Sequence, residues 1–275
     1  MAKPSTLHSQ ESDFKLVEIL LPHVRKSFVD IGAEKGSFAR FLMEHGFTGA
    51  IFEPLPKHAT ALASLTRGTN NRYFDYAVDQ TDGAREFHVA CDERGEPLDF
   101  FHSLQRLDND ARVHHNKSIP VTCRSLASLH AAGLIPDNLG VLKIDTEGND
   151  LRVLRGLGPV RSDVIICEFF TSGVYAGWTD AEPLGLVNQA RQSGNPHCVA
   201  IRRRGTAELI SLNPDRFTDQ EWGNLVFMTD SVLAAARKGI AQHIVDIENR
   251  LFRQLEAVQA KPKRRWFSRR ASAEP

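Results

Sequence analysis

The sequence is poor in cysteine and has no long apolar run, and these absences exclude several classes of protein. Its 275 residues include only four cysteines, and no two of them form a Cys-x-x-Cys pair. We therefore expect neither a disulfide scaffold nor a zinc cluster. No apolar run approaches the roughly 18 residues of a membrane span, and the first residues lack the apolar core of a signal peptide. These features predict a cytoplasmic protein.

The chain as a whole has no excess of positive or negative charge, but basic residues are concentrated at its C-terminus. The chain has 34 lysines and arginines against 34 aspartates and glutamates. Residues 261–275 contain six basic residues and one acidic residue, whereas the rest of the chain has a net charge of −5. Because no basic surface of sufficient extent is indicated, we expect no nucleic-acid partner. The stretch 261–270, which includes Trp266 and Phe267, could contact an anionic membrane surface. A solvated flexible tail is the alternative.

Short apolar segments alternate with amphipathic helical patterns through most of the chain. This alternation predicts an α/β fold in which a doubly wound, mostly parallel sheet of seven strands is covered on both faces. In such sheets, ligands bind at the carboxyl ends of the strands. The strands are expected at 27–31, 49–52, 72–78, 139–144, 163–169, 197–202 and 224–228.

The alternating pattern and the segments on either side of it divide the chain into four parts. Residues 1–26 form an N-terminal helix or cap, and residues 27–230 form the main domain, which an insertion at 83–119 interrupts before the fourth strand. An amphipathic helix is expected at 231–260 and a basic flexible tail at 261–275. The apolar stripe of the C-terminal helix predicts packing on the main domain or on a second copy of the chain, as in a homodimer.

Two glycines follow the first expected strand, in the run Val29–Phe38 (VDIGAEKGSF). Gly32 and Gly36 permit a sharp turn and a close approach of the backbone to a ligand. The amides at the start of the next helix would face that ligand. The G-x-x-x-G spacing lacks the middle glycine of the dinucleotide fingerprint, which argues against a nicotinamide-dependent oxidoreductase. An ordinary strand-to-helix turn would also explain the motif.

Polar and aromatic residues follow the second and third expected strands. Glu53 ends the second strand, where a carboxylate is placed to accept hydrogen bonds from ribose hydroxyls. A solvated loop carboxylate is the alternative. At the end of the third strand, Tyr76 and Ala77 offer a flat ring and a small side chain to flank an adenine.

Asp145 and Glu147 come directly after the fourth expected strand. Carboxylates at this position can orient a substrate hydroxyl, act as general base or hold a divalent cation, although we assign no metal site. They can also stabilise the N-terminus of the next helix. His102 in the insertion is a third candidate base because histidine titrates near neutrality. A structural role in an aromatic loop is its alternative.

Several of these segments together resemble the FkbM family of S-adenosylmethionine-dependent methyltransferases. The similar segments are, in order, VDIGAEKGSFA, FEPLP, YAVDQTDG, VLKIDTEGNDLRVLRG and VIICEF. The run Lys143–Gly156 is the most specific of them. The resemblance implies a Rossmann-like class I methyltransferase fold whose seventh strand is antiparallel. It also implies S-adenosylmethionine as cofactor and O-methylation of a sugar, glycan, polyketide or other small metabolite.

The resemblance also implies the site residues. Cofactor binding is assigned to Asp30, Gly32, Ala33, Gly36, Ser37, Phe38, Glu53, Pro54, Tyr76, Ala77 and Asp145. Asp145 and Glu147 match the acidic pair of the family signature, and they join His102 as catalytic candidates. The sequence departs from the family pattern at Glu34, where asparagine is usual, and at Ser128, where aspartate is expected.

The expected reaction is a direct displacement, in which the enzyme holds the attacking oxygen in line with the methyl group. The acceptor is not identified by the sequence. The rival interpretation from another class of protein is a non-catalytic α/β module that binds a partner through its C-terminal helix.

Overall fold

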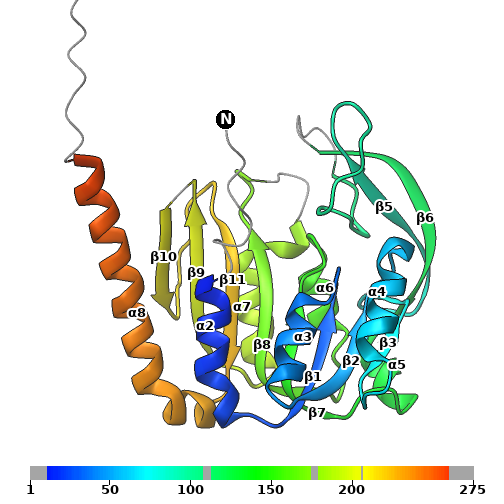
Figure 1. Cartoon of the computed structure of the whole chain (residues 1–275), viewed down its shortest axis with the longest axis horizontal. Helices are drawn as coiled ribbons and strands as arrows, with labels where there is room; N and C mark the ends of the chain where they lie inside the picture. Colours follow the sequence, from blue (N-terminus) through cyan, green and yellow to red (C-terminus); the bar gives the residue numbers. More distant parts are fainter. Residues whose placement is uncertain (1–10, 108–112, 175–178, 206, 260–275) are drawn as a thin grey trace, which may run out of the picture.

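A mixed sheet of eight strands forms the centre of the molecule (Figure 1). The computed structural model describes residues 11–107, 113–174, 179–205 and 207–259. The strand order is β10-β9-β11-β8-β7-β1-β2-β3. The strands are β1 (Ser27–Ile31), β2 (Thr48–Phe52), β3 (Arg72–Phe74), β7 (Asn138–Ile144), β8 (Arg161–Phe170), β9 (His197–Arg204), β10 (Ala207–Leu212) and β11 (Trp222–Met228).

The sheet is mostly parallel, as predicted, but the expected number of seven strands is wrong. Neighbouring strands from β3 to β8 pair in parallel, and β11 runs antiparallel to both β8 and β9. The eighth strand, β10, pairs antiparallel with β9 at the edge of the sheet. Its residues are at most half-buried, so it lacks the continuous apolar run that identified the other strands.

The expected third strand, 72–78, is also wrong, because the chain changes sheets within it. After β3, the strand β4 (Ala77–Val78) pairs with β6 (His114–Arg124), which in turn pairs with β5 (Gly83–Cys91). The insertion provides β5 and the first part of β6 in this second sheet, and β6 continues past the expected boundary at residue 119. Within the insertion, the segment Leu98–Leu107 is a loop.

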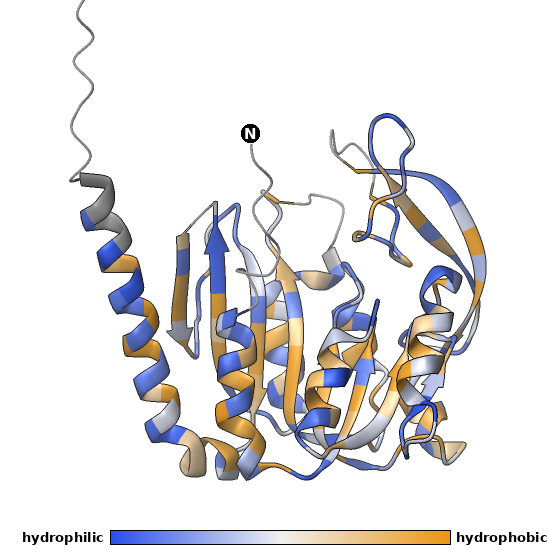
Figure 2. Cartoon of the chain, viewed as in Figure 1, coloured by the Kyte–Doolittle hydropathy of each residue, from blue (hydrophilic) through white to orange (hydrophobic). Residues whose placement is uncertain are grey.

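Helices cover both faces of the main sheet because successive strand residues point to opposite sides. Phe28 packs in the cluster that includes α2, α3 and α8, whereas Val29 packs in the cluster that includes α5, α6 and α7. Figure 2 shows apolar residues along the strands and on the helix faces that meet them. The helices are α2 (Glu11–Leu20), α3 (Ser37–Glu44), α4 (Pro56–Thr66), α5 (Leu126–Ala131), α6 (Asp150–Arg155), α7 (Pro183–Gln192) and α8 (Asp230–Gln259), with short 3-10 turns at Leu21–His23 and Thr179–Ala181.

The C-terminal helix α8 lies against α2 and β10 (Figure 1). Val232, Ala236, Ile240 and Ile247 form the buried part of its apolar stripe, so packing on the main domain is confirmed. A homodimer through α8 stays a prediction. Residues 261–275, and with them the predicted membrane contact at 261–270, lie outside the described residues. In the part of the chain that the structure describes, no helix is long and apolar enough to span a bilayer.

Candidate functional site

A pocket of about 490 Å³ opens at the carboxyl ends of the parallel strands. The strand ends converge there because β1, β2 and β7 are neighbours that run in the same direction. Of the predicted site residues, all except Gly36 line this pocket. They are Asp30, Gly32, Ala33, Ser37, Phe38, Glu53, Pro54, Tyr76, Ala77, His102, Asp145 and Glu147.

Gly32 makes the sharp turn that leaves β1. Its φ is +73°, and its N–H donates to the carbonyl of Phe52 at 2.9 Å. A Cβ atom on Gly32 would lie 1.8 Å from the carbonyl oxygen of Asp145. Only glycine therefore allows the ends of β1 and β7 to approach so closely.

Gly36 makes the second turn of this segment, at the start of α3. Its φ is +79°, and a Cβ there would lie 2.8 Å from methyl groups of Leu62 and Leu65 in α4. The residue lets α3 begin in close contact with α4, behind the pocket wall. It therefore supports the turn and does not line the pocket.

Glu53 is held at the end of β2 by two backbone amides. Its Oε2 accepts from the N–H of Glu34 at 2.9 Å, and its Oε1 accepts from the N–H of Leu55 at 2.8 Å. Burial raises its pKa to about 7, although both amides favour the ionised form. Each oxygen keeps a lone pair, so the carboxylate can accept further hydrogen bonds from a ligand.

Aromatic rings extend from the same end of the sheet. Phe52 stacks on Phe74 with ring centroids 5.2 Å apart, and Phe74 stacks on Tyr76 at 5.9 Å. Tyr76 and Ala77 form part of the pocket wall. A flat apolar ligand group can pack against this wall by stacking.

Asp30 is a buried acid with incomplete hydrogen bonding. Its side chain is 2% exposed, and no described residue bonds to its Oδ2. Burial raises the pKa of Asp30 to about 7, the nearby Lys143 lowers it, and Asp145 raises it further. A ligand that donates a hydrogen bond or carries positive charge would relieve this site.

Lys143 and Glu168 also line the pocket, and the sequence analysis did not identify either of them. The Lys143 ammonium lies 2.7 Å from Oδ2 of Asp145, and its positive charge holds the pKa of Asp145 below the usual range. Glu168 hydrogen-bonds to Asp145, and burial raises its pKa well above normal. The Glu168 carboxyl therefore keeps its proton and donates a hydrogen bond to the ionised Asp145. Each is a charged residue inside an otherwise apolar strand, and this pattern in the sequence could have identified both Lys143 and Glu168 as candidate site residues.

The backbone of Glu147 has a φ of +52°, which is unusual for a residue other than glycine. Its carboxyl accepts a hydrogen bond from the backbone of Phe101 in the insertion. Its Oε2 is buried and has no hydrogen-bond partner among the residues that the structure describes. Burial, followed by the charge of Asp145, raises the pKa of Glu147 to about 8. Phe101 also has a positive φ of +71°. Strain of this kind tends to concentrate at functional sites.

Asp145, Glu147 and Glu168 form an acidic corner, in which one oxygen of each lies within 4.8 Å of the others. Adjacent parallel strands bring them together, since Ile144 of β7 is in register with Cys167 of β8. Lys143 provides one positive charge here. The corner can accommodate a further cationic group of an organic ligand, and its oxygens are also of the type that bind a divalent metal.

His102 lies on the pocket wall with both ring nitrogens engaged. Nδ1 accepts from the N–H of Ala90 at 2.9 Å, and Nε2 lies 2.9 Å from Nζ of Lys57. Burial and the charge of Lys57 lower its pKa to about 4. The ring is therefore neutral near pH 7 and a weaker proton acceptor than an ionised Glu147.

The far end of the pocket is formed by residues from outside the predicted set. Asp13 of α2 and Asn224 of β11 both line it. Asp13 pairs with Arg203 of β9, and burial raises the pKa of Asp13 to about 6. The N-terminal helix therefore contributes to the pocket as well as covering the sheet.

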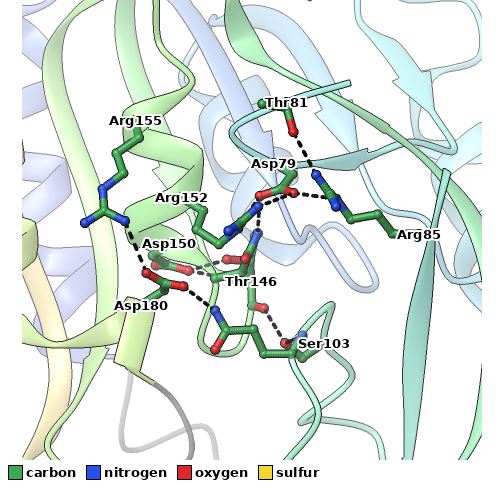
Figure 3. A network of polar contacts seen from close by, with 11 residues as sticks. Asp79, Thr81, Arg85, Ser103, Thr146, Asp150, Arg152, Arg155 and Asp180 are labelled. Carbon is green, nitrogen blue, oxygen red and sulfur yellow. Dashed lines mark hydrogen bonds and ion pairs between the residues drawn. The ribbon is translucent and has the colours of Figure 1, made fainter. Parts of the chain in front are cut away.

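A polar network includes Thr146 of the loop that bears Asp145 and Glu147, together with Asp150 and Asp79 (Figure 3). Asp150 accepts from the N–H groups of Thr146 at 2.9 Å and Glu168 at 2.8 Å, so it fixes the loop after β7 to β8. Asp79 binds Arg152 of α6 and Arg85 of the insertion. These contacts join the insertion, α6 and the acidic loop into one unit.

The unliganded protein is expected to lose stability between about pH 6.5 and 8.5. Asp30, Glu53 and Glu147 have pKa values raised to about 7, 7 and 8, so the folded state keeps protons that the unfolded chain has released. His58 and His102, with pKa values lowered to about 4, oppose this trend only below about pH 6.5. Each acid contributes at most about 1.4 kcal/mol per pH unit. Urea unfolding at three pH values measures the effect, and a constant or rising free energy of unfolding would contradict it.

Comparisons with known proteins are consistent with a methyl-transfer site. The family model described as Methyltransferase FkbM domain matches residues 30–203, which is more than half of the chain. No curated protein matches the chain.

Three solved structures of low sequence identity are similar to the chain. Precorrin-6y C5,15-methyltransferase from Geobacter metallireducens is 11% identical, with 83% of this chain and 93% of that chain covered and a TM-score of 0.41. An rRNA methylase from Streptococcus thermophilus is 7% identical, with 83% and 99% covered and a TM-score of 0.40. Precorrin 8w decarboxylase from Methanobacterium thermoautotrophicum is 12% identical, with 82% and 92% covered and a TM-score of 0.40.

Proposed function

Because this chain belongs to the FkbM methyltransferase domain family, we propose that it methylates a hydroxyl group of a sugar or another small metabolite. The family implies a cofactor of the S-adenosylmethionine type, which supplies an electrophilic methyl group when bound. The transfer of this group to oxygen, and the small size of the acceptor, are the parts that we propose.

The residues of the pocket fit this cofactor. The single observation that carries the proposal is the set of buried carboxyls with unmet hydrogen-bonding capacity, above all Oδ2 of Asp30 and the two oxygens of Glu53. S-adenosylmethionine offers the complementary groups: ribose hydroxyls that donate hydrogen bonds, an ammonium group and a positively charged sulfur. Tyr76 and Ala77 form an apolar wall suited to its adenine.

Each residue has a physical task in this proposal. Glu53 accepts the ribose hydroxyls, and the Gly32 turn brings the backbone close to the ligand. Asp30 and Asp145 provide negative charge near the positive end of the ligand. Holding both reactants in line is the main source of rate in such a displacement.

Glu147 is the proton acceptor that the geometry favours. Its pKa of about 8 without ligand falls when a cation binds beside it, which gives an ionised carboxylate near neutral pH. Glu147 would take the proton that the acceptor hydroxyl loses as its oxygen gains the methyl group, while the S–CH3 bond of the donor would break and its sulfur would leave as a neutral thioether. Asp145 is the alternative, but its ion pair with Lys143 makes it a weaker base.

The experiment that tests the proposal has two stages. Calorimetry should detect one S-adenosylmethionine site, and Glu53→Gln should reduce its affinity by about 10- to 100-fold because a charge-assisted acceptor is lost. Mass spectrometry of reactions with hydroxyl-bearing sugars and metabolites should then show addition of one methyl group. Failure to bind S-adenosylmethionine would contradict the proposal, as would methylation confined to nitrogen or carbon.

A further inference from the structure

We infer that Asp145, Glu147 and Glu168 select the charged methyl donor over the uncharged product, so that S-adenosylhomocysteine binds more weakly than S-adenosylmethionine. The inference rests on the proposed function. It adds a specificity role for the acidic corner and predicts that the product inhibits the enzyme only weakly.

The two ligands differ by one methyl group and one positive charge, both on the sulfur atom. Their adenine, ribose and amino-acid groups are the same. Contacts from Glu53 to the ribose therefore contribute equally to the binding of both. Only a protein group that senses the charge at sulfur can separate the two affinities strongly.

The acidic corner lies where it can sense that charge. Glu53 follows β2, Asp145 and Glu147 follow β7, and Glu168 lies within β8. In the sheet, β1 lies between β2 and β7. Neighbouring strands are about 4.8 Å apart, so the distance from the ribose-binding acid to the corner is about two to three strand spacings. A nucleoside anchored at Glu53 therefore extends its sulfur-bearing side along the strand ends toward the corner.

Once Glu147 ionises, the corner has more negative charge than Lys143 balances. Lys143 forms an ion pair with Asp145, but across the described ranges neither Glu147 nor Glu168 forms an ion pair with a basic side chain. Oε2 of Glu147 is buried and lacks a hydrogen-bond partner there as well. An organic cation would supply both the charge and the attraction that this oxygen lacks.

A neutral sulfur leaves the same carboxyls uncompensated. Glu147 must then either remain ionised beside Asp145 or take up a proton, and both states lose the attraction that a cation provides. The raised pKa values of Glu147 and Glu168 agree with this shortage of positive charge. The donor therefore gains from ionisation of the corner, whereas the product does not.

This difference should appear as a pH dependence of the ratio of the two affinities. Protonation of Glu53 affects both ligands similarly and cancels in the ratio, and so does protonation of Asp30 where this residue acts on the ammonium group that the two ligands share. Ionisation of Glu147 between about pH 6 and 8.5 favours the donor alone. We expect a preference for the donor of at least about tenfold at pH 8.5, falling to about twofold at pH 6.

Calorimetry with S-adenosylmethionine and S-adenosylhomocysteine tests the inference on the full chain. The two dissociation constants are measured at pH 6 and 8.5 for the wild type, for Glu147→Gln and for Glu53→Gln. In Glu147→Gln the preference and its pH dependence should be largely lost. In Glu53→Gln, the matched control, both affinities should fall together and the ratio should stay as in the wild type.

The outcomes separate this inference from the proposed function. Equal affinities for the two ligands at both pH values, or an unchanged ratio in Glu147→Gln, would overturn the charge selection while leaving cofactor binding intact. Absence of binding by both ligands would contradict the proposed function. Glu147→Ala provides a second variant if Glu147→Gln does not fold, and it should reduce the preference in the same direction.

Discussion

Gly32→Ala is expected to abolish detectable binding of S-adenosylmethionine and to lower the free energy of unfolding by about 3 kcal/mol. The added Cβ would lie 1.8 Å from the carbonyl oxygen of Asp145, so the ends of β1 and β7 must separate. The same separation would disturb the bond from the N–H of Asp145 to the carbonyl of Ile31, which is 3.0 Å long. Calorimetry and urea unfolding measure the two effects.

Gly68→Ala is the matched control for this change. Gly68 has nearly the same φ, +72°, but a Cβ there would meet nothing within 4 Å. The variant should therefore lose only the roughly 1–2 kcal/mol that a left-handed backbone costs a non-glycine residue, with unchanged ligand affinity. If both variants had the same stability and the same affinity, close contact between the strand ends would not be what requires glycine at position 32.

Asp79→Ala is expected to lower the free energy of unfolding by about 3 kcal/mol. The Asp79 side chain is only 1% exposed and lies between two arginines, with Arg152 Nε at 2.8 Å and Arg85 Nε at 2.6 Å. Its removal leaves two guanidinium groups without their common partner and detaches the insertion sheet from α6. Urea unfolding gives the loss of stability, and hydrogen exchange should show faster exchange in β5 and β6.

Arg155→Ala changes the same network at an exposed position. Arg155 is 45% exposed and lies 3.4 Å from Asp180, so its loss should cost less than about 1 kcal/mol. Comparable losses for the two variants would show that burial of Asp79 is not the source of its effect. Protection of β5 and β6 that is unaffected in Asp79→Ala would show that the insertion does not depend on this contact.

The local signals in the sequence located most elements of the main sheet. The apolar run SFVDI, followed by Gly32, gave the bounds of β1, because a buried parallel strand is continuously apolar and ends where the chain must turn. Ser37 begins α3, and Pro56 begins α4, where proline fits the first helical turn. These features depend on residues close together in the chain.

The errors occurred where pairing with a distant segment decided the structure. The run 72–78 reads as one strand, but Phe74 pairs with β2 and Ala77 pairs with β6 of the insertion. The edge strand β10 depends on pairing with β9 and has no continuous apolar run of its own. Neither partner can be identified from local periodicity.

The sequence by itself determined the α/β class, the family, and the glycine and carboxylate positions at the ends of the strands, because these follow from short motifs and apolar periodicity. Only the tertiary structure decided which charges face one another. It placed Lys143 beside Asp145 and Glu168 opposite Glu147. It also showed that Asp13 of the N-terminal helix lines the pocket and that Gly36 does not. The physical reason is that strand order and burial set the distances between these groups, and those distances determine their protonation and the charge of the ligand they can bind.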